Sequence, residues 1–236
     1  MSEPQPRVED HLAQVRRRIL EACRRCNRDP STVTLIGVSK FKPIEAVIEA
    51  ARAGLCDFGE NYAQELLAKA DAAHEAALGI RWHFIGALQS NKARKVAGVA
   101  TSVQSVDRPS LIATLAAATS PAHPLDVWIE VNLAGEAQKS GAATSDVDAL
   151  ARLVLEAPGL HLAGLMTVPP IVDDPEQSRS FFRALRSLRN DLLAACAPRQ
   201  GILAGLSMGM SHDFEVAIEE GATMVRVGTA IFGSRT

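Results

Sequence analysis

Lys40 is the residue of this sequence that is best placed to carry out chemistry. It follows the apolar run LIGVS, so its stem is expected among hydrophobic side chains while its amine reaches the end of a strand. Partial desolvation lowers the pKa of an ammonium group, and a neutral lysine amine attacks an aldehyde or ketone to form a Schiff base. The spacing also fits an ordinary solvated lysine, and Lys42, next to Pro43, is typical of a loop.

Two short glycine-containing segments near the C-terminus could bind an anion. The sequence SMGMSHD, residues 207–213, opens a predicted helix, and RVGT, residues 226–229, closes the last apolar run. Glycine lets backbone N–H groups approach an anion closely, and helix N-termini present unpaired donors with a favourable dipole. Such motifs are equally typical of turns, so phosphate binding and turn formation both stay open.

Arg226 alternates with Val225 and Val227, which predicts that it faces the opposite side of its strand. With the valines against helices, the guanidinium group points inward, where an unpaired charge is expensive. We therefore expect a partner, either an internal carboxylate such as Glu130 or a heteroatom of a ligand.

Histidine and cysteine give weaker signals. His83 alternates with Trp82 and Phe84 on a predicted strand, where a hydrogen-bonded structural histidine is more common than a ligand-binding one. His212 lies in the first turn of a late helix and is expected to be solvated. Cys23 and Cys26 form a C-x-x-C motif but continue a helical apolar stripe, and a zinc site needs four donors, so we expect them to pack.

The elements that would position these residues alternate in type. After an amphipathic helix over residues 7–26, short apolar runs alternate with helical segments. The expected strands cover residues 33–40, 56–60, 82–86, 102–106, 125–133, 161–168, 202–209 and 223–233. One expected helix begins at Pro43 and another near Lys92. The others cover residues 61–77, 108–119, 145–156, 175–195 and 212–220.

Regular alternation of strand and helix implies a parallel sheet with right-handed crossovers. Eight such units close into a (β/α)8 barrel, while a doubly wound open sheet is the alternative. No G-x-G-x-x-G motif follows the first strand, which weakens a dinucleotide-binding interpretation. In a barrel the functional groups gather at the C-terminal ends of the strands, where Lys40, Asn61 and Gly228 lie.

Composition supports this fold and excludes several classes of partner. The chain has 236 residues, close to the roughly 250 of such a barrel, and is 47% apolar but only 4% aromatic. Its net charge of −2 is spread along the chain, so we expect no binding to nucleic acid or an anionic membrane. The polar N-terminal segment and the lack of a long apolar run predict a cytoplasmic protein, with residues 1–236 forming a single domain.

The chain closely resembles the pyridoxal phosphate homeostasis proteins, which bind pyridoxal 5'-phosphate (PLP). The matching segments run nearly from end to end: GVSKFKP (37–43), FGENYAQE (58–65), WHFIGALQSNK (82–92), QSVDR (104–108), EVNLAGEAQKSG (130–141), GLMTVPP (164–170), LSMGMSHDFEVAI (206–218) and MVRVGTAIFG (224–233). Two positions depart from the family pattern. Ala87 stands where the family usually has proline, and His212 where it often has an acidic or small residue.

The resemblance implies a barrel like the N-terminal cofactor domain of alanine racemase, preceded by an extra helix. It implies that PLP forms a Schiff base, an aldimine, with Lys40 and that Arg226 faces the pyridine nitrogen. It further implies that the phosphate is held by Ser211, Gly228 and Thr229, with Asn61, Met208 and Gly209 nearby.

An arginine at the pyridine nitrogen disfavours protonation there and weakens the ring as an electron sink. Racemases of similar barrel type share this arginine, but the chain has a single tyrosine, Tyr62, and we expect no covering domain. The sequence therefore predicts a monomeric carrier that buffers PLP or delivers it to PLP-dependent apo-enzymes, without catalytic turnover. The alternatives are a single-domain amino-acid racemase and a Schiff-base aldolase that acts on a sugar phosphate without PLP.

Overall fold

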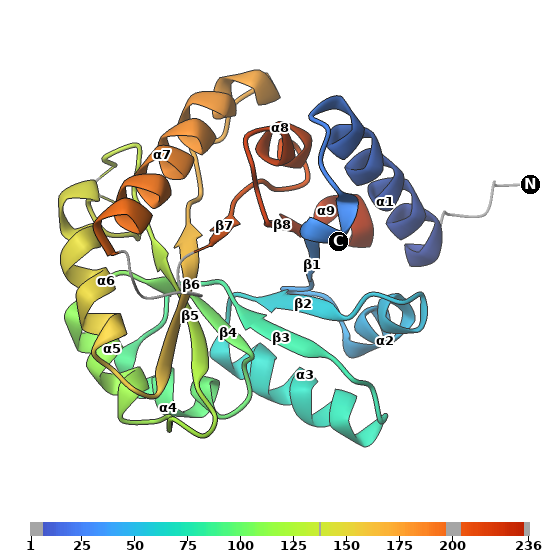
Figure 1. Cartoon of the computed structure of the whole chain (residues 1–236). Helices are drawn as coiled ribbons and strands as arrows, with labels where there is room; N and C mark the ends of the chain where they lie inside the picture. The colour runs from blue at the N-terminus through green and yellow to red at the C-terminus, as the bar shows by residue number, and fades with distance from the viewer. Residues whose placement is uncertain (1–6, 137, 197–203, 234–236) are drawn as a thin grey trace, which may run out of the picture.

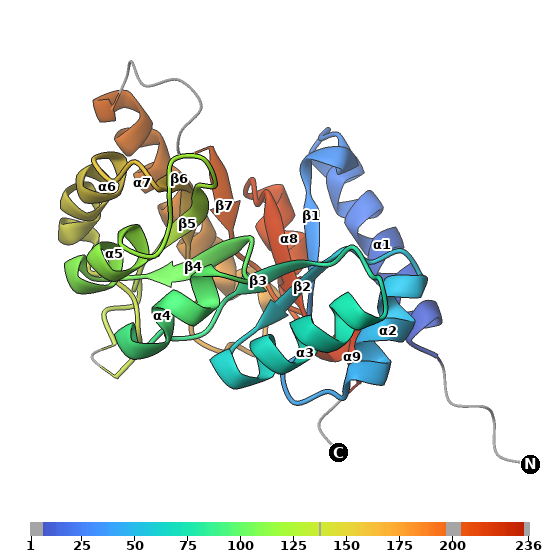
Figure 2. The same ribbon diagram turned by 90° about the horizontal axis from the view of Figure 1, so that it is seen from below.

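A computed structural model describes residues 7–136, 138–196 and 204–233. Its parallel strands β1 to β8 pair in chain order and close into a barrel, with helices around the outside (Figure 1). This topology confirms the predicted (β/α)8 barrel and excludes the open, doubly wound sheet. Figure 2 shows helices α3, α4 and α5 along the outer face of the sheet.

The strands are short and the helices begin close to the predicted positions. The strands are β1 (Thr34–Val38), β2 (Asp57–Glu60), β3 (Arg81–Phe84), β4 (Ser102–Val106), β5 (Leu125–Glu130), β6 (Leu160–Met166), β7 (Gly205–Ser207) and β8 (Met224–Val227). The helices are α1 (Val8–Arg25), α2 (Ile44–Arg52), α3 (Ala63–Glu75), α4 (Ser90–Ala97), α5 (Pro109–Ala116), α6 (Val147–Leu155), α7 (Arg179–Cys196), α8 (Phe214–Glu219) and α9 (Thr229–Phe232). The predicted strand over 202–209 is found at Gly205–Ser207, and residues 202 and 203 lie outside the described residues.

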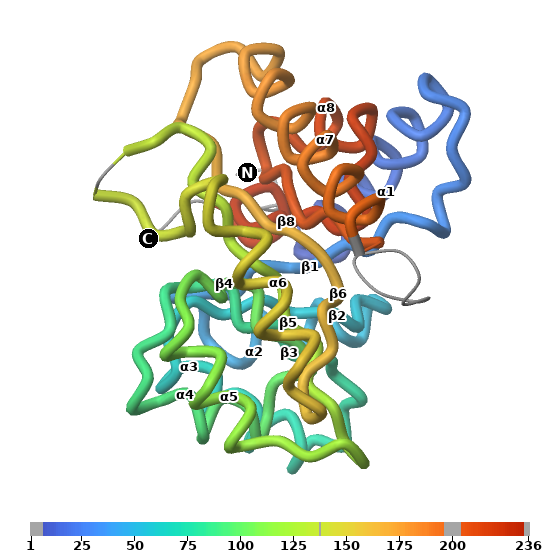
Figure 3. The backbone as a smooth tube through the Cα atoms, turned by 60° about the vertical axis from the view of Figure 1, so that its left-hand side comes forward, coloured from blue at the N-terminus to red at the C-terminus, as the bar shows by residue number. Residues whose placement is uncertain are grey.

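Helix α1 is the addition to the barrel that the sequence predicts. Its apolar stripe of Leu12, Val15 and Ile19 is buried, and the helix packs against α8 and α9. Cys23 on the same stripe is fully buried and Cys26 is half-buried, as expected for residues that pack. Figure 3 shows α1, α7 and α8 on the same flank of the barrel. None of the described helices is both long and apolar enough to cross a lipid bilayer.

Closure of the barrel places the first strand beside the last. Ile36 pairs with Arg226 and Gly37 pairs with Val227, so β1 and β8 run in parallel register. Beyond the strand ends, a Cβ atom on Gly228 would lie only 3.3 Å from the carbonyl oxygen of Val38. The turn that carries Lys40 therefore begins next to the loop that follows β8.

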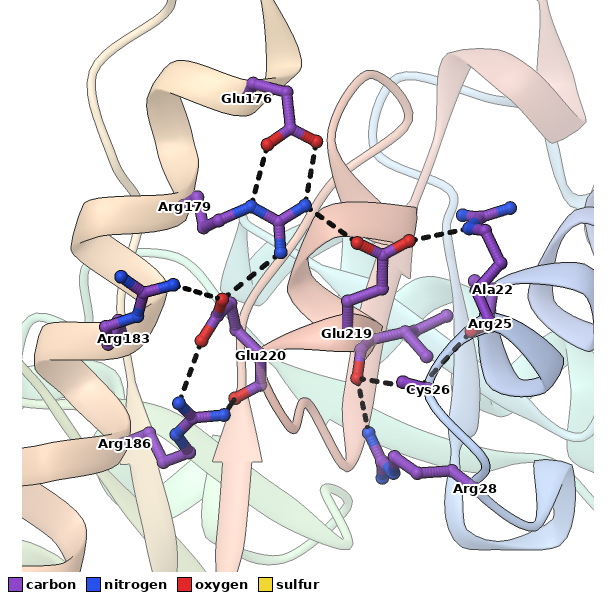
Figure 4. Close-up of polar contacts among 11 residues, drawn as sticks. Ala22, Arg25, Cys26, Arg28, Glu176, Arg179, Arg183, Arg186, Glu219 and Glu220 are labelled. Atoms are coloured by element: carbon purple, nitrogen blue, oxygen red, sulfur yellow. Dashed lines mark hydrogen bonds and ion pairs between the residues drawn. The ribbon is translucent and has the colours of Figure 1, made fainter.

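A cluster of arginines and glutamates joins α7 to α8 (Figure 4). The side chain of Glu220, at the end of α8, is only 5% exposed. Guanidinium nitrogens of Arg179, Arg183 and Arg186 lie 3.2, 3.0 and 3.0 Å from its carboxylate oxygens. One nearly buried carboxylate thus forms ion pairs with three arginines of α7.

The neighbouring Glu219 extends this cluster to α1. Its Oε2 lies 2.7 Å from Arg179, and its Oε1 accepts a hydrogen bond of 2.7 Å from Arg25 of α1. Three helices are thus connected through two adjacent carboxylates, as Figure 4 shows. Helix α8 directly follows the predicted phosphate segment, and this connection holds the C-terminal end of α8.

We predict that Glu220→Ala lowers the free energy of unfolding by about 2 kcal/mol, because three arginines lose a nearly buried carboxylate. Urea denaturation measures this loss. The matched control is Glu176→Ala, which also removes a partner of Arg179 but whose side chain is 58% exposed. Solvent screening limits the control's loss to less than about 1 kcal/mol. Equal losses in the two variants would contradict the structural role assigned to Glu220.

Candidate functional site

The segments after β7 and β8 lie against each other. The Oγ atom of Ser211 accepts hydrogen bonds from the backbone N–H groups of Gly228 at 3.1 Å and Ala230 at 3.3 Å. Upstream, the N–H of Arg226 donates to the carbonyl of Gly209 at 2.9 Å. The two glycine-containing segments that the sequence singled out therefore form one joined pair of loops.

Gly209 allows the first of these loops to pass close to α8. Its φ angle is +90°, a region that favours glycine, and an added Cβ atom would collide with the Cβ atom of Ala217. The preceding Met208 is fully buried, and its N–H donates to the carbonyl of Met224. The backbone around Gly209 is thereby fixed at the mouth of the barrel.

Arg226 points into the barrel, as its alternation with two valines predicts, and is 4% exposed. Its Nη1 donates to the Oγ of Ser207 at 2.7 Å and its Nη2 to the carbonyl of Thr167 at 2.8 Å. Burial lowers its pKa to about 10, although Coulomb attraction to Glu130 opposes this shift. Of the two kinds of partner that the sequence left open, direct pairing with Glu130 is not seen among the described residues, because Ser207 and Thr167 supply neutral acceptors within reach and the carboxylate acts only from farther away.

A chain of hydrogen bonds continues from Arg226 down the inside of the barrel. The Oγ of Ser207 donates to the Oε1 of Gln104 at 2.6 Å, and the Nε2 of Gln104 lies 3.5 Å from the Oγ of Ser102. The Nδ1 of His83 lies 2.7 Å from the same Ser102 oxygen, and its Nε2 lies 2.9 Å from Asp57. Both ring nitrogens of His83 are thus engaged, which confirms that it is a structural histidine.

Asp57 ends this chain at the floor of the barrel. Burial raises the pKa of its carboxyl group, but hydrogen bonds from His83 and Arg81 outweigh this effect and hold the pKa below its usual value. The sequence analysis missed the chain of interior polar groups. The signal was available, because Ser102 and Gln104 occupy alternate positions on one strand and therefore share a face.

We expected Lys40 to end strand β1. It lies two residues beyond the strand, in a turn, and is half-buried. The N–H of Lys42 donates to the carbonyl of Ser39 at 3.0 Å and closes the turn. Phe41 adopts a φ angle of +61°, and its ring lies 5.1 Å from that of Tyr62. The strand ends early because this turn redirects the chain toward α2.

A buried group of charged side chains lies beneath this turn. The ammonium group of Lys69, on α3, contacts Glu60 at 2.7 Å and Glu65 at 3.0 Å. The sequence analysis did not single out Lys69. Its position between Leu66 and Ala73 on the buried stripe of α3 was the signal, because a lysine in such a stripe needs a buried partner.

Asn61 follows β2 and lies against the loop after β3. It is half-buried, and a Cβ atom on Gly86 would collide with its backbone. A cavity of about 570 Å³ opens beside it, with Ala87 in its lining. On the opposite side of the mouth, the exposed His212 contacts the carbonyl of Asp173 at 3.0 Å. Both departures from the family pattern therefore lie in loops at the barrel mouth.

Comparison with known proteins agrees with this architecture. The family model "Alanine racemase, N-terminal domain" matches residues 11–236. A protein from Pseudomonas aeruginosa named pyridoxal phosphate homeostasis protein is 48% identical over 230 residues, which cover 97% of this chain and 96% of that protein. The chain belongs to the pyridoxal phosphate homeostasis protein family. The resemblance stated from the sequence is therefore confirmed.

Two solved structures have folds similar to that of this chain. The structure of PipY from Synechococcus elongatus PCC7942 with PLP bound has a TM-score of 0.83 and 32% identity, and the match covers 96% of this chain and 100% of PipY. Alanine racemase from Corynebacterium glutamicum has a TM-score of 0.68 at 17% identity, and the match covers 96% of this chain and 61% of the racemase. The second likeness shows that the barrel fold is shared.

Glu130, at the end of β5, gives the barrel mouth a titratable group. It is 6% exposed and accepts a hydrogen bond of 3.2 Å from the hydroxyl of Ser140. Burial raises its pKa from the ordinary 4.5 to about 7, and the nearby Asp107 adds to this shift. Between these values the folded protein keeps a proton that the unfolded chain has released, so stability falls as the pH rises.

We predict that Glu130→Gln, which remains neutral, removes this pH dependence. The variant and the parent protein are expected to be similarly stable near pH 4.5, whereas at pH 8 the variant is more stable by about 2 kcal/mol. Urea denaturation across this range measures the difference. A difference that stays constant with pH, or a variant that is less stable at pH 8, would contradict the raised pKa of Glu130.

Proposed function

We propose that this protein carries PLP as a Schiff base on Lys40 and buffers the cofactor or delivers it to PLP-dependent apo-enzymes. The observation that carries the proposal is the position of the Lys40 turn beside the joined loops after β7 and β8. An amine and the two glycine-containing loops thus lie at one mouth of the barrel. The family name and the PLP-bound structure of PipY support PLP as the ligand.

In this proposal the Nζ atom of Lys40 forms a C–N bond with the aldehyde carbon of PLP, and the carbonyl oxygen leaves as water. The hydroxyl of Ser211 accepts two backbone N–H bonds and still has its own hydrogen to donate to a phosphate oxygen. Thr229 follows at the N-terminus of α9, next to Gly228, whose own N–H is bonded to Ser211. Asn61, Met208 and Gly209 complete the surroundings of the ligand.

Arg226 faces the pyridine nitrogen in this proposal. It remains protonated at neutral pH, since its lowered pKa is still about 10. A cation there disfavours protonation of the pyridine nitrogen and makes the ring a poor electron sink for carbanion chemistry. Tyr62 is the single tyrosine of the chain, is 49% exposed and contacts the ring of Phe41 in a tilted arrangement. We therefore propose a carrier without turnover. We also propose that it is monomeric and cytoplasmic.

Borohydride reduction tests where PLP is held. After incubation with PLP and reduction, we expect mass spectrometry to find one pyridoxyl group, on the peptide that contains Lys40. Lys40→Ala should lose this label because the amine that is proposed to attack the aldehyde is removed. Lys42→Ala, two residues away in the same loop, is the matched control and should keep it. A label that persists in Lys40→Ala would overturn the assignment.

Incubation with amino acids tests the absence of turnover. We expect the PLP-loaded protein to leave the chirality of L-alanine and other L-amino acids unchanged, because the guanidinium group of Arg226 would make the ring a poor electron sink for carbanion chemistry. Chiral chromatography after prolonged incubation measures this, with an alanine racemase as the positive control. Accumulation of D-amino acid above the level given by free PLP would favour the racemase alternative.

A further inference from the structure

The ammonium group of Lys69 uses all three of its hydrogens inside the protein. It donates to the carbonyl of Ser39 at 2.7 Å, to Glu60 Oε1 at 2.7 Å and to Glu65 Oε2 at 3.0 Å. The side chain of Lys69 is only 8% exposed and that of Glu60 is fully buried. Since an ammonium group has three donors, this arrangement leaves none for any other partner.

These bonds hold the backbone on both sides of Lys40. Ser39 precedes it, and its carbonyl accepts from Lys69 while its hydroxyl donates to Glu60 at 2.6 Å. Phe41 follows it, and its backbone N–H donates to Glu65 Oε2 at 2.8 Å. Both residues that flank Lys40 are therefore connected to a single cluster formed by β2 and α3.

The turn needs such an external restraint. The φ angle of +61° at Phe41 is unfavourable for a residue with a Cβ atom and costs about 1–2 kcal/mol. The side chain of Phe41 is 51% exposed, so burial of its ring does little to hold the turn. The hydrogen bond from its N–H to Glu65 opposes relaxation of the backbone, in addition to the bond from the Lys42 N–H to Ser39 that closes the turn.

Stability alone does not explain this cluster. Burying the ammonium group of Lys69 and the carboxylate of Glu60 is expensive, and apolar side chains of similar size often serve stability as well or better. The Oε2 atom of Glu60 is buried without a hydrogen-bond partner among the described residues, which adds to the cost. Burial accordingly raises the pKa of Glu60, despite its hydrogen bond from Lys69.

We propose that Lys69 is a positioning residue for Schiff-base formation, which acts through the Ser39 carbonyl and through Glu65 to hold the Lys40 turn. This inference rests on the proposed function, because it assumes that the amine of Lys40 reacts with the aldehyde of PLP. The cluster itself does not touch the ligand. It fixes the direction in which the Lys40 side chain leaves the backbone.

Two binding measurements separate positioning from a general structural role. Imine absorbance during titration with PLP reports on Lys40, whereas calorimetric titration with pyridoxine 5'-phosphate, which lacks the aldehyde, reports on binding of the ring and phosphate. We expect Lys69→Met and Glu65→Ala each to weaken imine formation by about tenfold or more while pyridoxine 5'-phosphate affinity changes by less than about threefold. Glu65→Gln keeps an acceptor for the Phe41 N–H and should restore imine formation to within about threefold of the parent.

Arg183→Met is the matched control, because it also removes a cation from a carboxylate cluster but lies on α7, away from β1. It should leave both measurements unchanged. If Lys69→Met fails to fold, the Glu65→Ala variant alone provides the test. Imine formation at the parent level in Glu65→Ala would overturn the inference, as would a parallel loss of pyridoxine 5'-phosphate binding. If the parent protein itself formed no imine, the proposed function would fail first.

Discussion

The hydrogen-bonded pairing of β1 with β8 is the interaction on which the rest of the structure depends. It closes the barrel and brings residues from the two ends of the sequence into register, as with Ile36 and Arg226. Without closure, the Lys40 turn and the loops after β7 and β8 would lie at opposite edges of an open sheet. With it, an amine, a buried guanidinium group and a pair of glycine-containing loops share one mouth.

The site is then supported from two directions. Inside the barrel, hydrogen bonds run from Arg226 through Ser207 and Gln104 toward His83, so the guanidinium group is held from below. Outside the sheet, Lys69 and its carboxylates hold the turn that carries Lys40. Both supports consist of buried polar groups, which specify one arrangement when they are well satisfied. The geometry of the mouth therefore depends on residues that need not touch the ligand.

Much of the fold and part of the candidate site could be predicted, because the sequence patterns that indicate them are local. Apolar periodicity predicted the alternation of strands and helices, and the two valines beside Arg226 predicted its inward direction. The partners of Arg226 could not be predicted, because Ser207 and Thr167 reach it only through the registers of other strands. The end of β1 was also misplaced, because the turn at Phe41 depends on a hydrogen bond to Glu65, 24 positions away in the sequence. Contacts between distant segments account for what sequence patterns left open.

Membership of the pyridoxal phosphate homeostasis protein family makes PLP the natural ligand for this mouth, and the central claim is where and how it is held. The most direct measurement is a crystal structure of the protein loaded with PLP. The account predicts continuous electron density from the Nζ atom of Lys40 to the ligand, with the phosphate between Ser211 and Thr229 and the pyridine nitrogen at Arg226. PLP bound at another lysine, or a phosphate located away from these two loops, would contradict it.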